Sequence, residues 1–148
     1  MQTSVRPIRL LMAEDDIEDQ LLMRKAFEAA RVSTSLEVVC DGEELLDCLR
    51  KRGRFARSHR PDLILLDLNM PRCNGQEALE DIKRDPALKS IPVIVLTTSS
   101  REEDIVHSYR HGVNSFISKP TTFDRLIQVA AELGRYWTDT VTLPPNER

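Results

Sequence analysis

Five short apolar runs recur along the chain, separated by longer stretches of mixed polarity. The runs cover residues 8–13, 36–40, 63–68, 91–96 and 113–117. Three of them are nearly continuous Ile, Leu and Val, which is typical of strands buried on both faces of a parallel sheet. The intervening stretches carry apolar residues at three- and four-residue spacing, which predicts helices. The pattern therefore predicts a strand followed by a helix, five times over.

The predicted helices also show start and stop signals. Their apolar stripes are Ile17, Leu21, Leu22, Ala26 and Ala29; Ala78, Leu79 and Ile82; and Phe123, Leu126, Ile127, Ala130 and Leu133. Asp41 stands three residues before Glu44, and Ser100 three residues before Glu103, as in capping boxes at helix starts. Gly112 lies where a helix would end, just before the fifth run.

Strands that are joined through helices run parallel and cross over with one hand. The expected fold class is therefore α/β: a flavodoxin-like, doubly wound (βα)5 sandwich with a five-stranded parallel sheet in the order 2-1-3-4-5. Residues 1–6 are expected to be a flexible N-terminal lead, residues 7–137 the domain, and residues 138–148, with Pro144 and Pro145, a C-terminal tail.

Composition narrows the function classes. The 148 residues suit one domain, and 41% apolar residues supply a real core. A net charge of −3 argues against a dedicated nucleic-acid binder, and no apolar run approaches the roughly 20 residues of a membrane span or forms a secretory signal. The odd count of 3 cysteines, without paired metal spacing, indicates reduced thiols and a cytoplasmic location.

Polar residues follow four of the five predicted strands. Because the carboxyl ends of parallel strands face one ligand crevice, these residues are expected to converge; they are Glu14, Asp15 and Asp16, then Asp67, Thr97 and Lys119. Clustered carboxylates repel one another, and Mg²⁺ relieves this repulsion while also binding phosphate oxygens. A lysine and a hydroxyl nearby suit a phosphoryl group. Solvated loop starts would explain any one of these residues, but not all four positions.

In this order and spacing, the motifs resemble the response-regulator receiver domain over about residues 7–137. The motifs are Ala13-Glu14-Asp15-Asp16, the run from Asp62 through Asp67 to Pro71 with Gly75, Val95-Leu96-Thr97-Thr98-Ser99, and Ser118-Lys119-Pro120. The resemblance implies a phosphoacceptor protein of two-component signalling, which is not primarily an enzyme although it catalyses its own phosphorylation and slow dephosphorylation. The expected phosphodonor is a sensor histidine kinase.

The resemblance also implies a role for each site residue. Asp67 would be the phosphoacceptor, and Thr97 and Lys119 would contact the phosphoryl group. Asp15 would ligate Mg²⁺ directly, with Glu14 helping through a water molecule, and Asp67 and the carbonyl of Asn69 would be further ligands. Phe116 would be the aromatic switch residue that reports the movement of Thr97, and Lys119-Pro120 would be a cis peptide. Thr98, where many receivers have Ala, and Phe116, in place of Tyr, depart from the common pattern.

Further features resemble the small stand-alone receivers that are paired with bacterial and cyanobacterial phytochromes. They are the long segment before the third strand, the phrase Leu66-Asp67-Leu68-Asn69-Met70-Pro71, the run His107-Ser108-Tyr109, and the ending Tyr136-Trp137 with Thr142-Leu143-Pro144. This likeness implies a red-light-sensing kinase, a bacteriophytochrome, as partner. It also implies a homodimer with Tyr136 and Trp137 in the interface.

Two other functions remain open on the residues alone. A haloacid-dehalogenase-like phosphohydrolase would need an acidic residue two positions after Asp67, where this chain has Asn69. A receiver-like adapter that binds partners without phosphorylation is the other alternative, although every expected site residue is present. The glycines form no phosphate-cradling motif.

Other clusters have plainer interpretations. The basic stretch over residues 50–60 is interpreted as solvated surface, with an acidic docking partner as the alternative. His107 and His111, four residues apart on a predicted helix, are too few for a closed zinc site. Cys73, in the loop after Asp67, is interpreted as an inert thiol.

Overall fold

The computed structural model describes residues 7–70, 74–98, 101–140 and 142–145. Five parallel strands form one sheet in the order β2-β1-β3-β4-β5, which confirms the predicted fold class. The strands are β1 (Ile8–Ala13), β2 (Thr34–Val39), β3 (Leu63–Leu66), β4 (Val93–Thr97) and β5 (Ser115–Ser118). The helices are α1 (Ile17–Ala29), α2 (Gly42–Leu49), α3 (Gly75–Arg84), α4 (Glu102–Arg110) and α5 (Phe123–Arg135), with short turns η1 (Gly53–Phe55) and η2 (Tyr136–Thr140).

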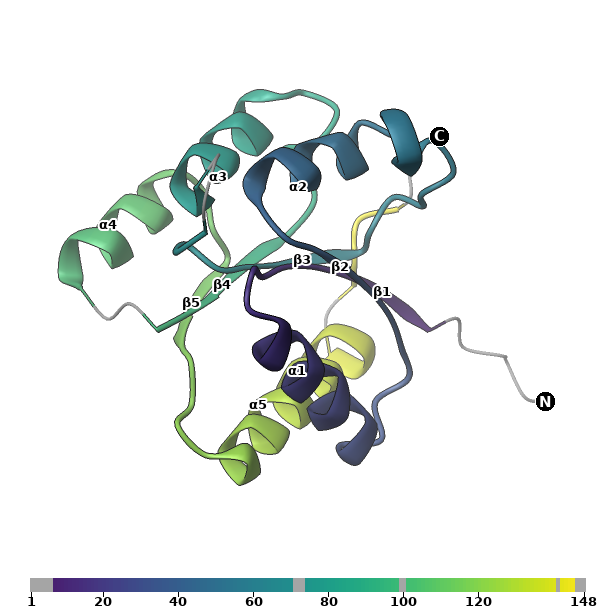
Figure 1. Cartoon of the computed structure of the whole chain (residues 1–148), viewed down its shortest axis with the longest axis vertical. Helices are drawn as coiled ribbons and strands as arrows, with labels where there is room; N and C mark the ends of the chain where they lie inside the picture. The colour runs from purple at the N-terminus through teal and green to yellow at the C-terminus, as the bar shows by residue number, and fades with distance from the viewer. Residues whose placement is uncertain (1–6, 71–73, 99–100, 141, 146–148) are drawn as a thin grey trace.

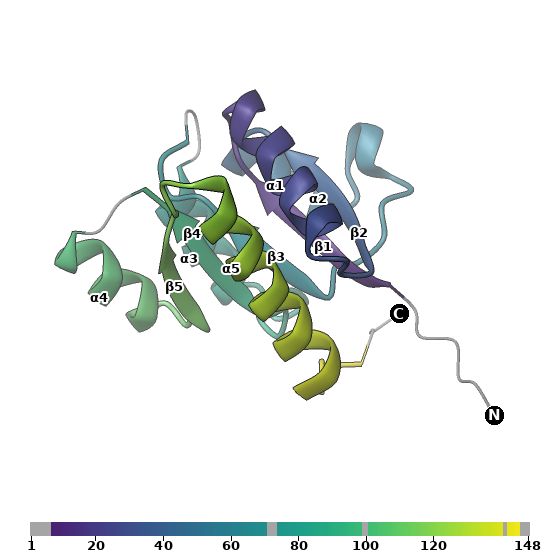
Figure 2. The ribbon, with the colours of Figure 1, turned by 90° about the horizontal axis from the view of Figure 1, so that it is seen from below.

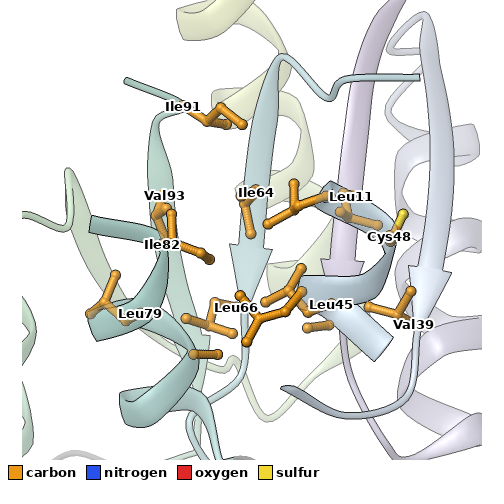
Figure 3. Packing of buried hydrophobic residues seen from close by; sticks show 14 of the residues in the cluster. Leu11, Val39, Leu45, Cys48, Ile64, Leu66, Leu79, Ile82, Ile91 and Val93 are labelled. Carbon is orange, nitrogen blue, oxygen red and sulfur yellow. The ribbon is translucent and has the colours of Figure 1, made fainter. Parts of the chain in front are cut away.

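The helices cover both faces of the sheet. Figure 1 shows α2, α3 and α4 on one face and α1 and α5 on the other, and Figure 2 shows α1 and α5 side by side across their face. Each face has its own core because side chains alternate along a strand. In β3, Ile64 and Leu66 pack under α2 and α3, as Figure 3 shows, whereas Leu63 and Leu65 pack under α1 and α5. All four are buried, as the continuous apolar run predicted.

The apolar stripe predicted for the first helix is largely wrong. Ile17, Leu21 and Leu22 are 77%, 51% and 41% exposed, and α1 instead turns Met23, Ala26 and Phe27 to the sheet. Apolar residues occupy nearly all sides of this helix, so spacing alone did not identify the buried side. The exposed residues lie near the start of α1, close to the carboxyl edge of the sheet.

The helix-end predictions meet different outcomes. Asp41 caps α2, since its Oδ1 accepts the backbone N–H of Glu44 at 2.8 Å. The residue before α4 is Arg101, which makes no side-chain cap; Ser100, the expected capping residue, lies outside the described residues. Gly112 follows the end of α4 with φ +87°, as expected from its place.

The peptide expected to be cis is trans. Among the described residues no peptide bond is cis, and this includes the bond between Lys119 and Pro120. The expectation came from the family resemblance alone, and the geometry corrects it.

The described residues after α5 pack back onto the domain. After α5 the backbone continues in a single π-helical turn as far as Thr140, and Leu143 packs against the core beneath α1 and α5. Trp137 is 8% exposed and belongs to that same core, with its ring edge-to-face against Tyr136 at 5.4 Å between centroids. Trp137 is therefore a core residue, which corrects its assignment to an interface, whereas Tyr136 is 50% exposed.

Candidate functional site

The polar residues that follow the strands meet at the carboxyl edge of the sheet. Glu14 follows β1, Asp67 follows β3, Thr97 ends β4 and Lys119 follows β5. The pairing of β1 with β3 brings the first two together, since the backbone N–H of Asp67 donates to the carbonyl of Ala13 at 3.1 Å. Glu14, Asp67 and Thr97 are buried, which is unusual for polar side chains and calls for internal partners.

Lys119 supplies the positive charge of this cluster. Its Nζ lies 3.2 Å from Oδ2 of Asp67 and 3.1 Å from Oδ2 of Asp19, and it also contacts Oε1 of Glu14. Asp19 was missed from the sequence because it lies inside the first turn of α1 rather than at a strand end. Its position three residues after Asp16, the N-cap residue of α1, placed it on the first turn that overhangs the crevice.

The other oxygen of Asp67 is held by hydrogen bonds. Oδ1 accepts the hydroxyl proton of Thr97 at 2.9 Å and the backbone N–H of Asn69 at 3.0 Å. The Nδ2 group of Asn69 lies 3.4 Å from Oγ1 of Thr97 and 3.5 Å from Oγ1 of Thr98. Thr98, the departure from the common pattern, is exposed and lies at the rim, within reach of the same amide. The Oδ1 atom of Asp67 is thus oriented by the end of β4 and by the loop that follows β3.

Burial governs the electrostatics of the cluster. It raises the pKa of Glu14 from 4.5 to about 7, against the opposing effect of Lys119. Burial also disfavours the ammonium of Lys119, but the hydrogen bond to Glu14 and the charge of Asp67 outweigh it, so the pKa of Lys119 is raised. Lys119 thus faces the carboxylates of Glu14, Asp19 and Asp67 as one cation among three acidic side chains.

Three carboxylates are close enough to share a cation. One oxygen from each of Glu14, Asp15 and Asp67 lies within 4.8 Å of the others, and Asp15 is exposed to solvent. A set of hard carboxylate oxygens that is open on one side fits Mg²⁺, which binds through one or two carboxylates and keeps several waters. Among the predicted ligands, the structure thus brings together Glu14, Asp15 and Asp67, and it places Asn69 at the same rim through its bond to Asp67.

A hollow beside the cluster joins polar and apolar walls. Its polar lining includes Glu14, Asp19, Asp67 and Lys119, and its apolar lining comes from α1 and the start of α5: Leu22, Met23, Phe123 and Leu126. Phe123 is 39% exposed. The carboxylate of Asp67 is therefore bordered by an apolar rim, which Leu22, Met23, Phe123 and Leu126 form.

The predicted switch residue lies farther from the cluster, on β5. Phe116 is half-buried and packs against the core beneath α2 and α3. Its backbone N–H donates to the phenolic oxygen of Tyr109 on α4 at 3.2 Å. Phe116 thus connects β5, which pairs with the strand that ends at Thr97, with α4.

The basic segment is in part used internally. Arg50 pairs with Asp85 at 3.4 Å, and Arg54 pairs with Glu44 at 2.8 Å while its guanidinium lies over the ring of Phe55. Arg60 donates to the carbonyl of Ala87 at 2.6 Å and to Ser90 at 3.1 Å. These contacts hold the segment before β3 in place, which favours the plainer interpretation. Across the described residues, no helix combines the length and the apolar character that crossing a membrane requires.

Comparison with known proteins decides the family. The family model named "Response regulator receiver domain" matches residues 10–131. The chain belongs to the response-regulator receiver family. It is therefore a signalling protein of two-component systems, whose phosphoacceptor chemistry the acidic cluster fits.

Individual relatives agree with this assignment. The chain is 38% identical over 138 residues, covering 93% of itself and 94% of the relative, to response regulator Rcp1 of Synechocystis sp.. The crystal structure of the phosphorylated cyanobacterial phytochrome response regulator RcpA is 42% identical with a TM-score of 0.88, covering 94% of this chain and 99% of RcpA. The Mn²⁺-bound form of Rcp1 is 37% identical with a TM-score of 0.86, covering 94% and 100%.

Proposed function

We propose that Asp67 accepts a phosphoryl group from a histidine kinase. The observation that carries this proposal is the arrangement around its carboxylate: Lys119 on one oxygen at 3.2 Å and the Thr97 hydroxyl on the other at 2.9 Å. A carboxylate oxygen attacks the phosphorus of the donor, the bond from phosphorus to the donor nitrogen or oxygen breaks, and an acyl phosphate forms. Such transfer depends mainly on positioning and on neutralising charge.

Each neighbour of Asp67 has a role in this reaction. The ammonium of Lys119 neutralises negative charge on the incoming group. The hydroxyl of Thr97, which bonds Asp67 in the unphosphorylated chain, is placed to donate to a phosphoryl oxygen instead. That change draws Thr97 toward the new group and alters the end of β4, from which Phe116 and Tyr109 pass the change to α4. The same residues support autophosphorylation from small donors and slow hydrolysis.

Mg²⁺ is the proposed cofactor. Glu14, Asp15 and Asp67 would hold it, with the carbonyl of Asn69 as a further ligand, and their clustered oxygens suit a hard cation. When bound, the ion supplies neutralisation of the charge on the transferring phosphoryl group. The Mn²⁺-bound form of the relative Rcp1 supports a divalent cation in this family.

The apolar rim supports the choice of partner. A kinase must bring its phosphohistidine to Asp67, and the exposed side chains of Leu22 and Phe123 line the hollow beside that carboxylate. Exposed apolar groups that surround a polar site are typical of protein docking surfaces. The relative RcpA is a cyanobacterial phytochrome response regulator, and Rcp1 is a response regulator of similar length. On this basis we propose a phytochrome-type histidine kinase as the donor. We also propose a cytoplasmic location, since both described cysteines are free thiols.

Self-association is a further part of the proposal. Tyr136 is 50% exposed at the end of α5, although the neighbouring Trp137 is buried. A large exposed aromatic suits an interface between two copies of the chain. Sedimentation analysis of wild type and Tyr136→Ser tests it: a dimer in the wild type that is weakened in the variant supports the role of Tyr136.

The phosphorylation proposal is tested with a small acyl-phosphate donor and Mg²⁺, followed by intact-mass measurement. Wild type is expected to gain one phosphoryl group, and Asp67→Asn or chelation with EDTA to abolish the gain. Asp62→Asn is the matched control, because Asp62 is also a buried aspartate but stands at the opposite end of β3. Phosphorylation that persists in Asp67→Asn would refute the assignment. A folded wild type that takes up no phosphoryl group and no beryllofluoride would favour the adapter function.

A further inference from the structure

A second cluster of potential metal ligands lies away from the acidic site, between α3 and α4. Glu80 of α3 and His107 and His111 of α4 each offer one ligand atom, and the three atoms lie within 4.8 Å of one another. Figure 1 shows α3 and α4 on the same face of the sheet. The two histidines, which the sequence placed on one helix, thus acquire a third ligand from a neighbouring helix.

Both imidazoles face the same carboxylate oxygen. Nε2 of His107 lies 3.4 Å and Nε2 of His111 lies 3.2 Å from Oε1 of Glu80. A charge-assisted N–H···O bond would be shorter, about 2.7–2.9 Å. Ligand atoms around a tetrahedral zinc ion, each about 2.0–2.2 Å from the metal, lie about 3.3–3.6 Å apart. The two distances from the imidazoles to Glu80 are therefore close to the edge length of a zinc tetrahedron, and the two imidazole nitrogens lie within 4.8 Å of each other.

Neighbouring groups orient the ligand atoms. Nδ1 of His111 lies 2.9 Å from the carbonyl oxygen of His107, which can only accept, so Nδ1 carries a proton. In the neutral form of the ring the lone pair is then on Nε2, which faces Glu80. A backbone carbonyl on the second ring nitrogen is typical of metal-binding histidines. Arg84 lies 3.6 Å from the other oxygen of Glu80, Oε2, which leaves Oε1 to the histidines.

We propose that Glu80, His107 and His111 form a binding site for Zn²⁺, separate from the acidic Mg²⁺ site. Two imidazoles and one carboxylate are a ligand set that zinc accepts with a fourth position open to water or to a ligand from another molecule. Both histidines are partly exposed, and Glu80 and His111 border an open hollow, so an ion reaches the site from solvent. Bound zinc would tie α4 to α3.

The test is a Zn²⁺ titration of metal-free protein against a chromophoric chelator, with excess Mg²⁺ present to occupy the acidic cluster. The pH is kept at about 7.5, because a metal-binding imidazole must be neutral. Wild type is expected to bind one Zn²⁺ per chain, and His107→Gln, His111→Gln and Glu80→Gln to bind it at least about tenfold more weakly. His59→Gln, at an exposed histidine outside the cluster, is the matched control and is expected to bind as wild type does.

Two further readouts accompany the titration. Co²⁺ in place of Zn²⁺ is expected to give the visible absorption of a four-coordinate site, absent in the three ligand variants. Zn²⁺ is expected to raise the Tm of wild type and of His59→Gln only, since binding to the folded state alone stabilises it. A wild type that retains no Zn²⁺, or a His107→Gln variant that binds it equally well, overturns the proposal. The three ligand residues are partly exposed, so their substitutions leave the core intact.

Discussion

Replacing Lys119 with methionine removes the cation that three carboxylates share. Glu14 and Asp67 have side chains only 4% and 7% exposed, so their charges lose a partner inside the protein. Leaving one side of a buried ion pair uncompensated costs about 3–5 kcal/mol. Asp19 is 39% exposed and adds little. Because burial already raises the pKa of Glu14 to about 7, proton uptake there relieves part of the cost. We therefore expect Lys119→Met to lose about 3 kcal/mol of its free energy of unfolding in EDTA, which is the lower end of that range.

Mg²⁺ should reverse much of this loss. The ammonium of Lys119 repels a divalent cation, so Lys119→Met is expected to bind Mg²⁺ more tightly than wild type does. Each tenfold gain in affinity narrows the stability gap at saturating Mg²⁺ by about 1.4 kcal/mol. A gap of about 3 kcal/mol in EDTA should therefore shrink to about 1.5 kcal/mol or less in Mg²⁺.

Urea denaturation measures both gaps, with the fluorescence of the buried Trp137 as the signal. Lys83→Met is the matched control. Lys83 is also partly buried, and burial lowers its pKa, but its Nζ donates to the carbonyls of Lys89 and Ile91 at 3.0 Å each rather than to a carboxylate. The free energy of unfolding that Lys83→Met loses should therefore be the same in EDTA and in Mg²⁺. A gap for Lys119→Met that is the same in EDTA and in Mg²⁺ would refute the charge-balance reasoning.

Two further predictions concern the loop after Asp67 and a buried thiol. In Gly75→Ala the new Cβ would lie 2.4 Å from the carbonyl oxygen of Asp67 and 2.5 Å from Cα of Leu68, both backbone atoms, so we expect a loss of about 1–3 kcal/mol in urea denaturation and slower phosphorylation; an unchanged midpoint would contradict this. Burial raises the pKa of Cys48 from 9.0 to about 11, so the thiol of the unfolded chain loses its proton at a lower pH than the thiol of the folded chain. The free energy of unfolding should therefore fall by about 2–3 kcal/mol as the pH rises from 9.0 to about 11. Cys48→Ala should lack this part of the pH dependence, and a wild type and variant whose stabilities fall equally with pH would exclude a role for Cys48.

The sheet could be predicted well where both faces of a strand are buried. The first run coincides with β1, Ile8–Ala13, because continuous apolar residues leave no choice of face. The edge strand β2 begins at Thr34, earlier than expected, because its alternating pattern of partly buried and exposed residues includes Ser and Glu. The face of α1 was not predictable, since which of its many apolar residues meet the sheet depends on how the helix is placed by α5.

The acidic site could be predicted because topology alone gathers strand ends. Contacts between side chains on two different helices could not be predicted in this way. Glu80 gives no sign in the sequence that it faces His107 and His111, because the contact requires α3 and α4 to be neighbours. Likewise the ending Tyr136-Trp137 contains two large aromatics, and only the packing of the π-helical turn decides that the second is core.

The contacts that hold α4 in place connect this helix both with the acidic cluster and with the proposed zinc site. Every residue of α4 is described, and only Ser108 is buried, so hydrophobic burial contributes little to its position. The contacts that hold it are largely polar: Gln76 to Ser108 at 3.4 Å, the phenol of Tyr109 to the N–H of Phe116 at 3.2 Å, and the histidines to Glu80. A helix with few apolar contacts opens or shifts at low free-energy cost.

Phosphorylation at Asp67 would act on this helix through Thr97 and β5. A metal between Glu80 and the histidines would act on it from α3, at the other side of the same element. Two ligands that bias one movable element are coupled, and the coupling is reciprocal: if zinc changes the affinity for beryllofluoride, beryllofluoride changes the affinity for zinc by the same factor. The size of that factor measures how far α4 itself carries the signal from the acidic cluster.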